Sequence, residues 1–235
     1  MFKQARYTLV SVTAAVLCWA APLRAAPSQA DISKEINLTT GAATSVIAGL
    51  QNKINGGSLA QPEVDIAALR AAFRESFKKN GGSDFEAAPD PQLGEIRKLF
   101  DEAFANVIEK YRADMLKGGQ DAFVPAFFRA QLLEFFNKKS QGKYQAIVTT
   151  RGNELINRDS APDKVIADKA VLEFVKGLLD KGEVEPQSKA IGERLVSYWP
   201  MKIAEPCAAC HQRSGLEQKV GSFGGATVVV VEAQR

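Results

Sequence analysis

The sequence predicts a mixed α+β fold. Apolar residues recur at helical spacing through several segments in the first two thirds of the chain, and glycine pairs follow many of these segments. The last third instead holds runs rich in β-branched residues, which favour strands. The composition, 46% hydrophobic and 24% charged over 235 residues, is that of a globular protein with one domain, or one domain with a helical extension.

The helical segments are bounded by recognisable start and stop signals. Helices are expected near 41–55 and over 64–79, 93–116, 122–137 and 163–180. The strongest pattern lies in 93–116, where one apolar stripe contains Phe100, Phe104, Val107, Ile108, Tyr111 and Met115. The last helix is expected to start at a cap formed by Ser160 or Asp163 and to end before Gly182.

Strands are expected where β-branched and aromatic residues dominate or alternate with polar ones. These segments are 144–150, 194–203 and 226–232, with a glycine-rich turn over 221–225 before the last of them. The order of elements therefore places helices first and most strands last.

The N-terminus has the pattern of a signal peptide. Lys3 and Arg6 precede an apolar stretch over 8–21, which is short for a spanning helix of about 20 residues. Small residues follow, so cleavage after Ala25, Ala26 or Ala30 is consistent with the sequence, and residues 1–30 are assigned as the signal peptide. The alternative is an uncleaved anchor. The predicted location is periplasmic or otherwise exported, with membrane contact only through the signal peptide before cleavage.

Removing residues 1–30 changes both the charge and the cysteine count. The segment carries three basic residues and no acidic one, so 27 basic and 27 acidic residues remain. A neutral protein gives no argument for binding nucleic acid or an anionic membrane surface. The single histidine excludes sites that need two imidazoles, and the two remaining cysteines exclude a disulfide-dense scaffold.

Those two cysteines and the histidine fall within one pentapeptide, Cys207-Ala-Ala-Cys210-His211. C-x-x-C-H is the attachment signature of c-type haem. Two thiols three positions apart can form thioethers with the two vinyl groups of a porphyrin, and the adjacent imidazole can then bind the iron. The sequence thus predicts one covalent haem c held by Cys207 and Cys210, with His211 as an axial iron ligand.

Other chemistries of the pentapeptide are less consistent with its context. A thioredoxin-type C-x-x-C belongs near the start of a βαβ unit, whereas this one lies near the C-terminus. A structural zinc site needs four ligands, and only two thiols and one imidazole are present. A plain disulfide remains an alternative, as does a four-helix-bundle cytochrome c, although the glycines and the valine run after His211 disfavour a final helix.

The C-terminal half resembles the c-type haem proteins with a PAS-like sensor fold, a family long catalogued as a domain of unknown function. The resemblance covers roughly 115–235 and rests on Phe127–Ala130, Thr149–Gly152, Asn157–Asp163, Tyr198–Ile203, the pentapeptide and Val220–Val228. It implies a PAS-like antiparallel sheet with helices over 117–235, preceded by a helical extension over 31–116. It further implies a redox or gas sensor, or an electron-transfer partner. A cysteine that ligates the iron from its second side in this family has no counterpart here.

The sequence does not single out one residue as the second axial ligand of the haem iron. The methionines outside the signal peptide are Met115 and Met201, and core packing is the simpler role for each. A lysine amine is another option. The remaining one is an open iron that binds a small gas beside Phe123, Phe127 and Phe128. The residues suited to pair with haem propionates are Arg151, Arg158 and Arg213.

The sequence contains no kinase, receiver or other output domain, so a sensing role requires a separate redox or signalling partner protein. Helices within 41–116 are candidates for that contact. A haem enzyme acting on a small oxygen or nitrogen species is the alternative function. It has little support beyond Arg129 as a distal polar group, because the only histidine is used for attachment. The chain is therefore expected to be a haem protein without catalytic residues.

Overall fold

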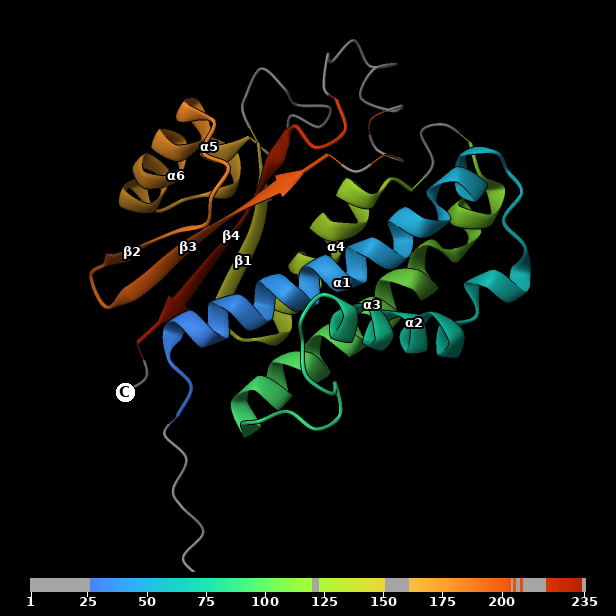
Figure 1. Cartoon of the computed structure of the whole chain (residues 1–235), viewed down its shortest axis with the longest axis horizontal. Helices are drawn as coiled ribbons and strands as arrows, with labels where there is room; N and C mark the ends of the chain where they lie inside the picture. The colour runs from blue at the N-terminus through green and yellow to red at the C-terminus, as the bar shows by residue number, and fades with distance from the viewer. Residues whose placement is uncertain are drawn as a thin grey trace, which may run out of the picture.

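The computed structural model describes residues 26–119, 123–150, 161–203, 205, 208 and 219–233. Four antiparallel strands form one sheet in the order β1-β4-β3-β2 (Figure 1). The strands are β1 (Tyr144–Thr149), β2 (Gln187–Ile191), β3 (Arg194–Lys202) and β4 (Phe223–Glu232). The helices are α1 (Gln29–Asn55), α2 (Ile66–Lys79), α3 (Pro91–Lys117), α4 (Pro125–Lys139), α5 (Pro162–Val165) and α6 (Lys169–Lys181), with a 3₁₀ turn η1 (Gln61–Val64). The predicted α+β class with a PAS-like antiparallel sheet is confirmed.

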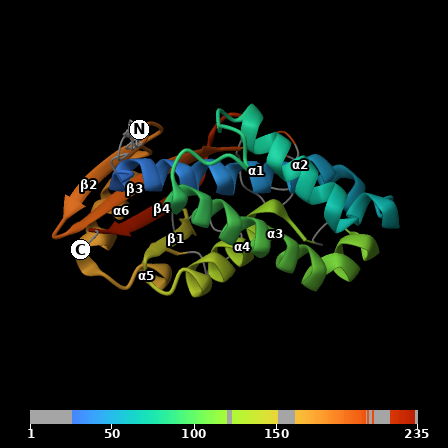
Figure 2. The same cartoon turned by 90° about the horizontal axis from the view of Figure 1, so that it is seen from below.

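Helices cover both faces of the sheet. The larger hydrophobic core joins α1, α2, α3 and α4 to one face, and the smaller core joins α5 and α6 to the other (Figures 1 and 2). Strand β4 lies between these cores, so Val228 and Val230 face one of them and Val229 and Val231 face the other. Burial on both faces explains why this strand is a continuous valine run rather than an alternating one.

The predicted domain boundary between residues 116 and 117 falls in the last turn of α3, just before the connection to α4. Residues on both sides of it contribute to the larger core, which reaches from Ile32 on α1 to Val231 on β4. The N-terminal helices therefore share one core with the sheet.

Helix α1 begins twelve residues before the expected start near 41. Ser28 caps it, because the Ser28 hydroxyl accepts from Asp31 N and the Asp31 carboxylate accepts from Ser28 N. Thr39, Thr40 and Thr44 are buried, and each hydroxyl donates a hydrogen bond to the backbone carbonyl four residues earlier. Burial against the rest of the protein thus stabilises a helix in a polar segment whose intrinsic helix propensity is modest.

The single helix predicted over 163–180 is wrong, because the chain breaks at 166–168 between α5 and α6. Ala161 precedes α5 without a side-chain cap, so Asp163 is not the cap. Asp168 caps α6 instead and accepts from Val171 N and Arg194 Nη2. These hydrogen bonds lower the pKa of Asp168 below its ordinary value, and the one from the backbone of Val171 has the larger effect. Ser160 lies outside the described residues.

Candidate haem-attachment site

The pentapeptide lies in the connection between the neighbouring strands β3 and β4. Backbone hydrogen bonds close the base of this connection: Ile203 N donates to Ser222 O at 2.8 Å, and Gly221 N donates to Ile203 O at 2.9 Å. We call these three residues the neck. The fold therefore fixes both ends of the segment that carries the pentapeptide.

The predicted attachment residues Cys207, Cys210 and His211 lie outside the described residues. Within the pentapeptide the structure describes Ala208, which is 5% exposed. The structure thus places the ends of the segment, while the role of the thiols and the imidazole remains a prediction from the sequence.

Two glycines at the start of β4 let three strands come together at the neck. Gly225 has φ of 119°, and a Cβ there would lie 2.7 Å from the Thr149 carbonyl oxygen. A Cβ on Gly224 would lie 2.6 Å from Ile203 Cδ1. The Gly-Gly-Ala segment that contributed to the family resemblance therefore has a structural role, because a larger residue at Gly225 would collide with the backbone of β1 and one at Gly224 would displace the Ile203 side chain.

Met201 lies beside the neck, on the second-last residue of β3. It pairs across the ladder with Gly225, and the Thr227 hydroxyl of β4 donates to its sulfur at 3.6 Å. Trp199 precedes it by two residues and therefore shares its face of the sheet, the one covered by α1 to α4. The Trp199 indole donates to Ser33 Oγ on α1 at 3.0 Å. Met201 is half-buried.

Met115 has a different environment. It lies on α3 in the larger core and is fully buried, which confirms the expected core position. The end of its helix packs against the C-terminal end of α1, where Gly119 N donates to Ile54 O at 3.1 Å.

The aromatic residues at the start of α4 form an edge-to-face cluster in the larger core. Phe123 contacts Tyr111, Phe127 and Phe128 with centroid separations between 5.4 and 6.0 Å. Their packing in the larger core is therefore confirmed. Arg129, the suggested distal polar group, donates from Nε to Thr44 Oγ1 on α1 at 3.0 Å.

The arginines expected to pair with propionates, Arg151, Arg158 and Arg213, also lie outside the described residues. Exposed charged residues described near the neck are Lys202, Lys219 and Glu205. The lysines supply positive charge there that the sequence analysis did not single out.

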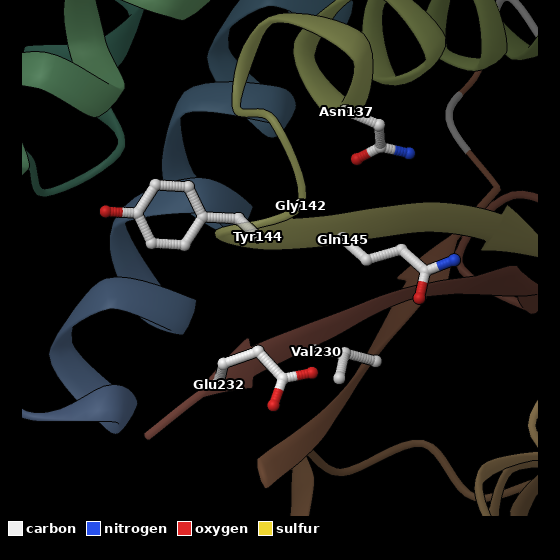
Figure 3. Close-up of a pocket in the computed structure, with 6 residues that line it drawn as sticks. All are labelled: Asn137, Gly142, Tyr144, Gln145, Val230 and Glu232. Carbon is white, nitrogen blue, oxygen red and sulfur yellow. The ribbon is translucent and has the colours of Figure 1, made fainter. Parts of the chain in front are cut away.

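A polar hollow of about 280 Å³ occupies the other end of the sheet, and the sequence analysis did not anticipate it. It is lined by Asn137, Gly142, Tyr144, Gln145, Val230 and Glu232 (Figure 3). The Tyr144 ring points away from the Gln145 and Glu232 side chains (Figure 3). Burial raises the pKa of the Tyr144 phenol, and a hydrogen bond from Gln92 to its oxygen partly opposes this. Met115 and Met201, the predicted haem-site residues that the structure describes, do not line the hollow.

The described residues contain no cluster of three or more histidine, cysteine, aspartate or glutamate side chains that could hold a metal ion. In the same part of the chain, no helix is long and apolar enough to cross a membrane. The pentapeptide lies outside this part, so the first finding does not test it.

Comparisons with known proteins give one distant structural likeness. No protein-family model matches the chain, and no curated protein matches it. A crystal structure of the cyanobacterial heme-protein Tll0287 aligns with 63% of this chain and 99% of its own, at 10% sequence identity and a TM-score of 0.35. A likeness at this level carries no cofactor over to this chain.

Proposed function

We propose that this chain is an exported mono-haem c protein that passes electrons, or a redox or gas signal, to a separate partner protein. The pentapeptide at 207–211 carries this proposal, because it gathers the sole histidine and both cysteines that remain after signal removal. The sheet supports it by closing the base of the segment at Ile203 and Ser222. A tethered segment of this kind limits where an attached group can lie.

The residues have separate tasks in this proposal. The thiols of Cys207 and Cys210 anchor the porphyrin, so the cofactor is retained even when its iron ligands exchange. The neutral imidazole of His211 binds the iron. The haem supplies one-electron chemistry or gas binding when attached, and the protein sets its potential through axial ligation, burial and hydrogen bonding.

The test is a haem assay on the protein exported from a host that attaches haem c. We expect the haem to remain with the polypeptide through denaturing electrophoresis and to give the pyridine haemochrome spectrum of a thioether-linked porphyrin. Trp199 supplies an independent signal, since the other tryptophan, Trp19, lies in the signal peptide. Energy transfer to a nearby haem would quench its fluorescence. Extraction of all haem by acidic acetone, or its absence, would refute the proposal.

We also propose that the signal peptide is removed before Ser28. Ser28 caps α1, and the Gln29 side chain donates to Glu193 O and Val231 O, at 3.1 and 2.9 Å, tying α1 to the sheet. Cleavage after Ala30 would remove these contacts, whereas cleavage after Ala25 or Ala26 keeps them.

The expected mature N-terminus is therefore Ala26 or Pro27, which intact-mass measurement of the exported protein would show. As a companion test, Gln29→Ala is expected to lower the melting temperature by a few degrees, consistent with loss of about 1 kcal/mol of hydrogen bonding. A mature chain that begins at Asp31 would contradict this assignment.

A further inference from the structure

We propose that the outer edge of β2 is a docking surface for an extended acidic segment of a partner protein, which pairs with β2 as a fifth strand. The inference rests on the proposed function only for the existence of a partner protein, and none of its evidence depends on haem. It is argued from the backbone of β2, from the side chains beside it and from the contrast with the other edge of the sheet.

The opposite edge, formed by β1, is closed by side chains at the end of α4. The Asn137 amide donates to Ala146 O and accepts from Ala146 N, both at 2.8 Å, as a neighbouring strand would. The Ser140 hydroxyl donates to Tyr144 O at 2.9 Å. These contacts use the outward backbone groups of β1, so an added strand has little left to pair with there.

The β2 edge has no such cover. A two-residue turn joins Ile191 to β3, so Ile191 directs its backbone groups to β3 and, by alternation, Ser188 and Ala190 direct theirs outward. Within the described part of the chain, neither of these residues has a backbone partner on that side. Both are exposed, and β2 lies at the outside of the sheet (Figure 1). The edge therefore offers two sets of N–H and C=O groups with the alternation that an antiparallel strand matches.

The side chains beside this edge indicate the chemistry of the added strand. Lys189 lies between Ser188 and Ala190, is exposed, and holds its ammonium 5.8 Å from the centroid of the Phe174 ring on α6. Phe174 and Leu178 are half-buried and four positions apart, so apolar surface accompanies the charge.

An added strand meets Lys189 at a position without backbone hydrogen bonds, where opposed side chains come closest. Opposite charges in such a pair stabilise the pairing, and like charges oppose it. The matching segment thus carries Asp or Glu opposite Lys189, with apolar residues two positions away on the same face.

A second copy of this chain is a poorer occupant of the edge. Lys189 is the central residue of β2, so the antiparallel register with the greatest overlap places Lys189 opposite its own copy. Lysine on an edge strand is a common device against pairing between copies. Lys189 therefore disfavours self-association and remains complementary to an acidic strand.

The test titrates the exported protein with the end-blocked peptide Thr-Val-Thr-Glu-Thr-Val-Thr and with a matched peptide that has lysine in place of glutamate. Saturating glutamate peptide should slow hydrogen exchange of the Ser188 and Ala190 amides and leave that of Ala146, which Asn137 already covers, unchanged. The lysine peptide should bind about two- to fivefold more weakly. Lys189→Glu should reverse this order, which a merely apolar contact would not do.

A proline variant separates strand addition from other modes of binding. Ala190→Pro removes an outward N–H without removing a hydrogen bond to β3, so it should keep the sheet and lose the peptide. Ala190→Thr keeps the N–H and is the matched control, which should bind as the wild type does.

Unchanged exchange at Ser188 and Ala190 under saturating peptide, or equal binding by Ala190→Pro, would overturn the inference. A free protein that is dimeric, with these amides already protected, would also overturn it and assign the edge to a second copy. The titration should give the same result in a variant with serine at both Cys207 and Cys210, because the edge does not involve haem. Absence of covalent haem in the wild type would instead refute the proposed function.

Discussion

Serine at both Cys207 and Cys210 is expected to abolish covalent haem while leaving the fold in place. A hydroxyl does not add to the vinyl groups as a thiol does, so no thioether forms. Among the described residues, the two hydrophobic cores are built from other segments, and Ala208 is not a member of either. The exported double variant should therefore show no haem after denaturing electrophoresis, a wild-type far-UV circular dichroism spectrum and recovered Trp199 fluorescence.

Cys18 provides a matched control for this experiment, because it lies in the predicted signal peptide. Cys18→Ser should leave the haem content unchanged. His211→Gly should keep the thioethers where maturation proceeds but change the spin state, since it removes an iron ligand rather than an anchor. Covalent haem in the double serine variant would show that the anchors lie elsewhere.

The regular elements with strong local signals were predicted well. Helix α3 was expected over 93–116 and spans Pro91–Lys117, and β1 was expected over 144–150 and spans Tyr144–Thr149. Both carry a residue pattern whose period matches the buried face of the element. Gly182 ends α6 in the left-handed conformation, as its position after the helix predicted.

Elements that depend on distant contacts were missed or shortened. Strand β2 was not anticipated, because its residues Gln187–Ile191 are largely exposed and give no apolar alternation. It exists because it pairs with β3, and Ser188 reaches Ser197 across the ladder at 3.0 Å. The first turns of α1 were missed for a related reason: the contacts of Gln29 and Ser33 join residues more than 160 positions apart.

The candidate site shows the same division. The pentapeptide was found from the sequence because its chemistry needs a fixed local spacing. The neck and the contact between Thr227 and Met201 join residues about twenty or more positions apart, and only the antiparallel register brings them together. The sequence therefore predicts the attachment chemistry, whereas the contact of Met201 with Thr227 and the full burial of Met115 emerge only from the fold.

Removal of the Arg97 guanidinium should cause one of the largest losses of stability in the protein. Arg97 on α3 is 3% exposed in its side chain and donates from Nε to Glu35 on α1. It also donates to Ser83 Oγ at 2.9 Å and to Asp84 O at 2.6 Å, which holds the loop before α3. Arg97→Met leaves Glu35 buried without this partner, at a cost of about 3–5 kcal/mol. Urea denaturation followed by circular dichroism measures this loss.

The double variant Glu35→Leu, Arg97→Met tests whether the loss comes from the orphaned charge. Most of the stability should return, because an apolar pair removes the uncompensated carboxylate. Recovery should be incomplete, since Ser83 and Asp84 still lack the donor. Lys143→Met serves as the control. It breaks the exposed contact of Lys143 with Glu95 and should leave the midpoint of urea denaturation unchanged. Equal losses of stability in the single and double variants would instead show that the effect comes from the lost contacts of Arg97 with Ser83 and Asp84 in the loop before α3.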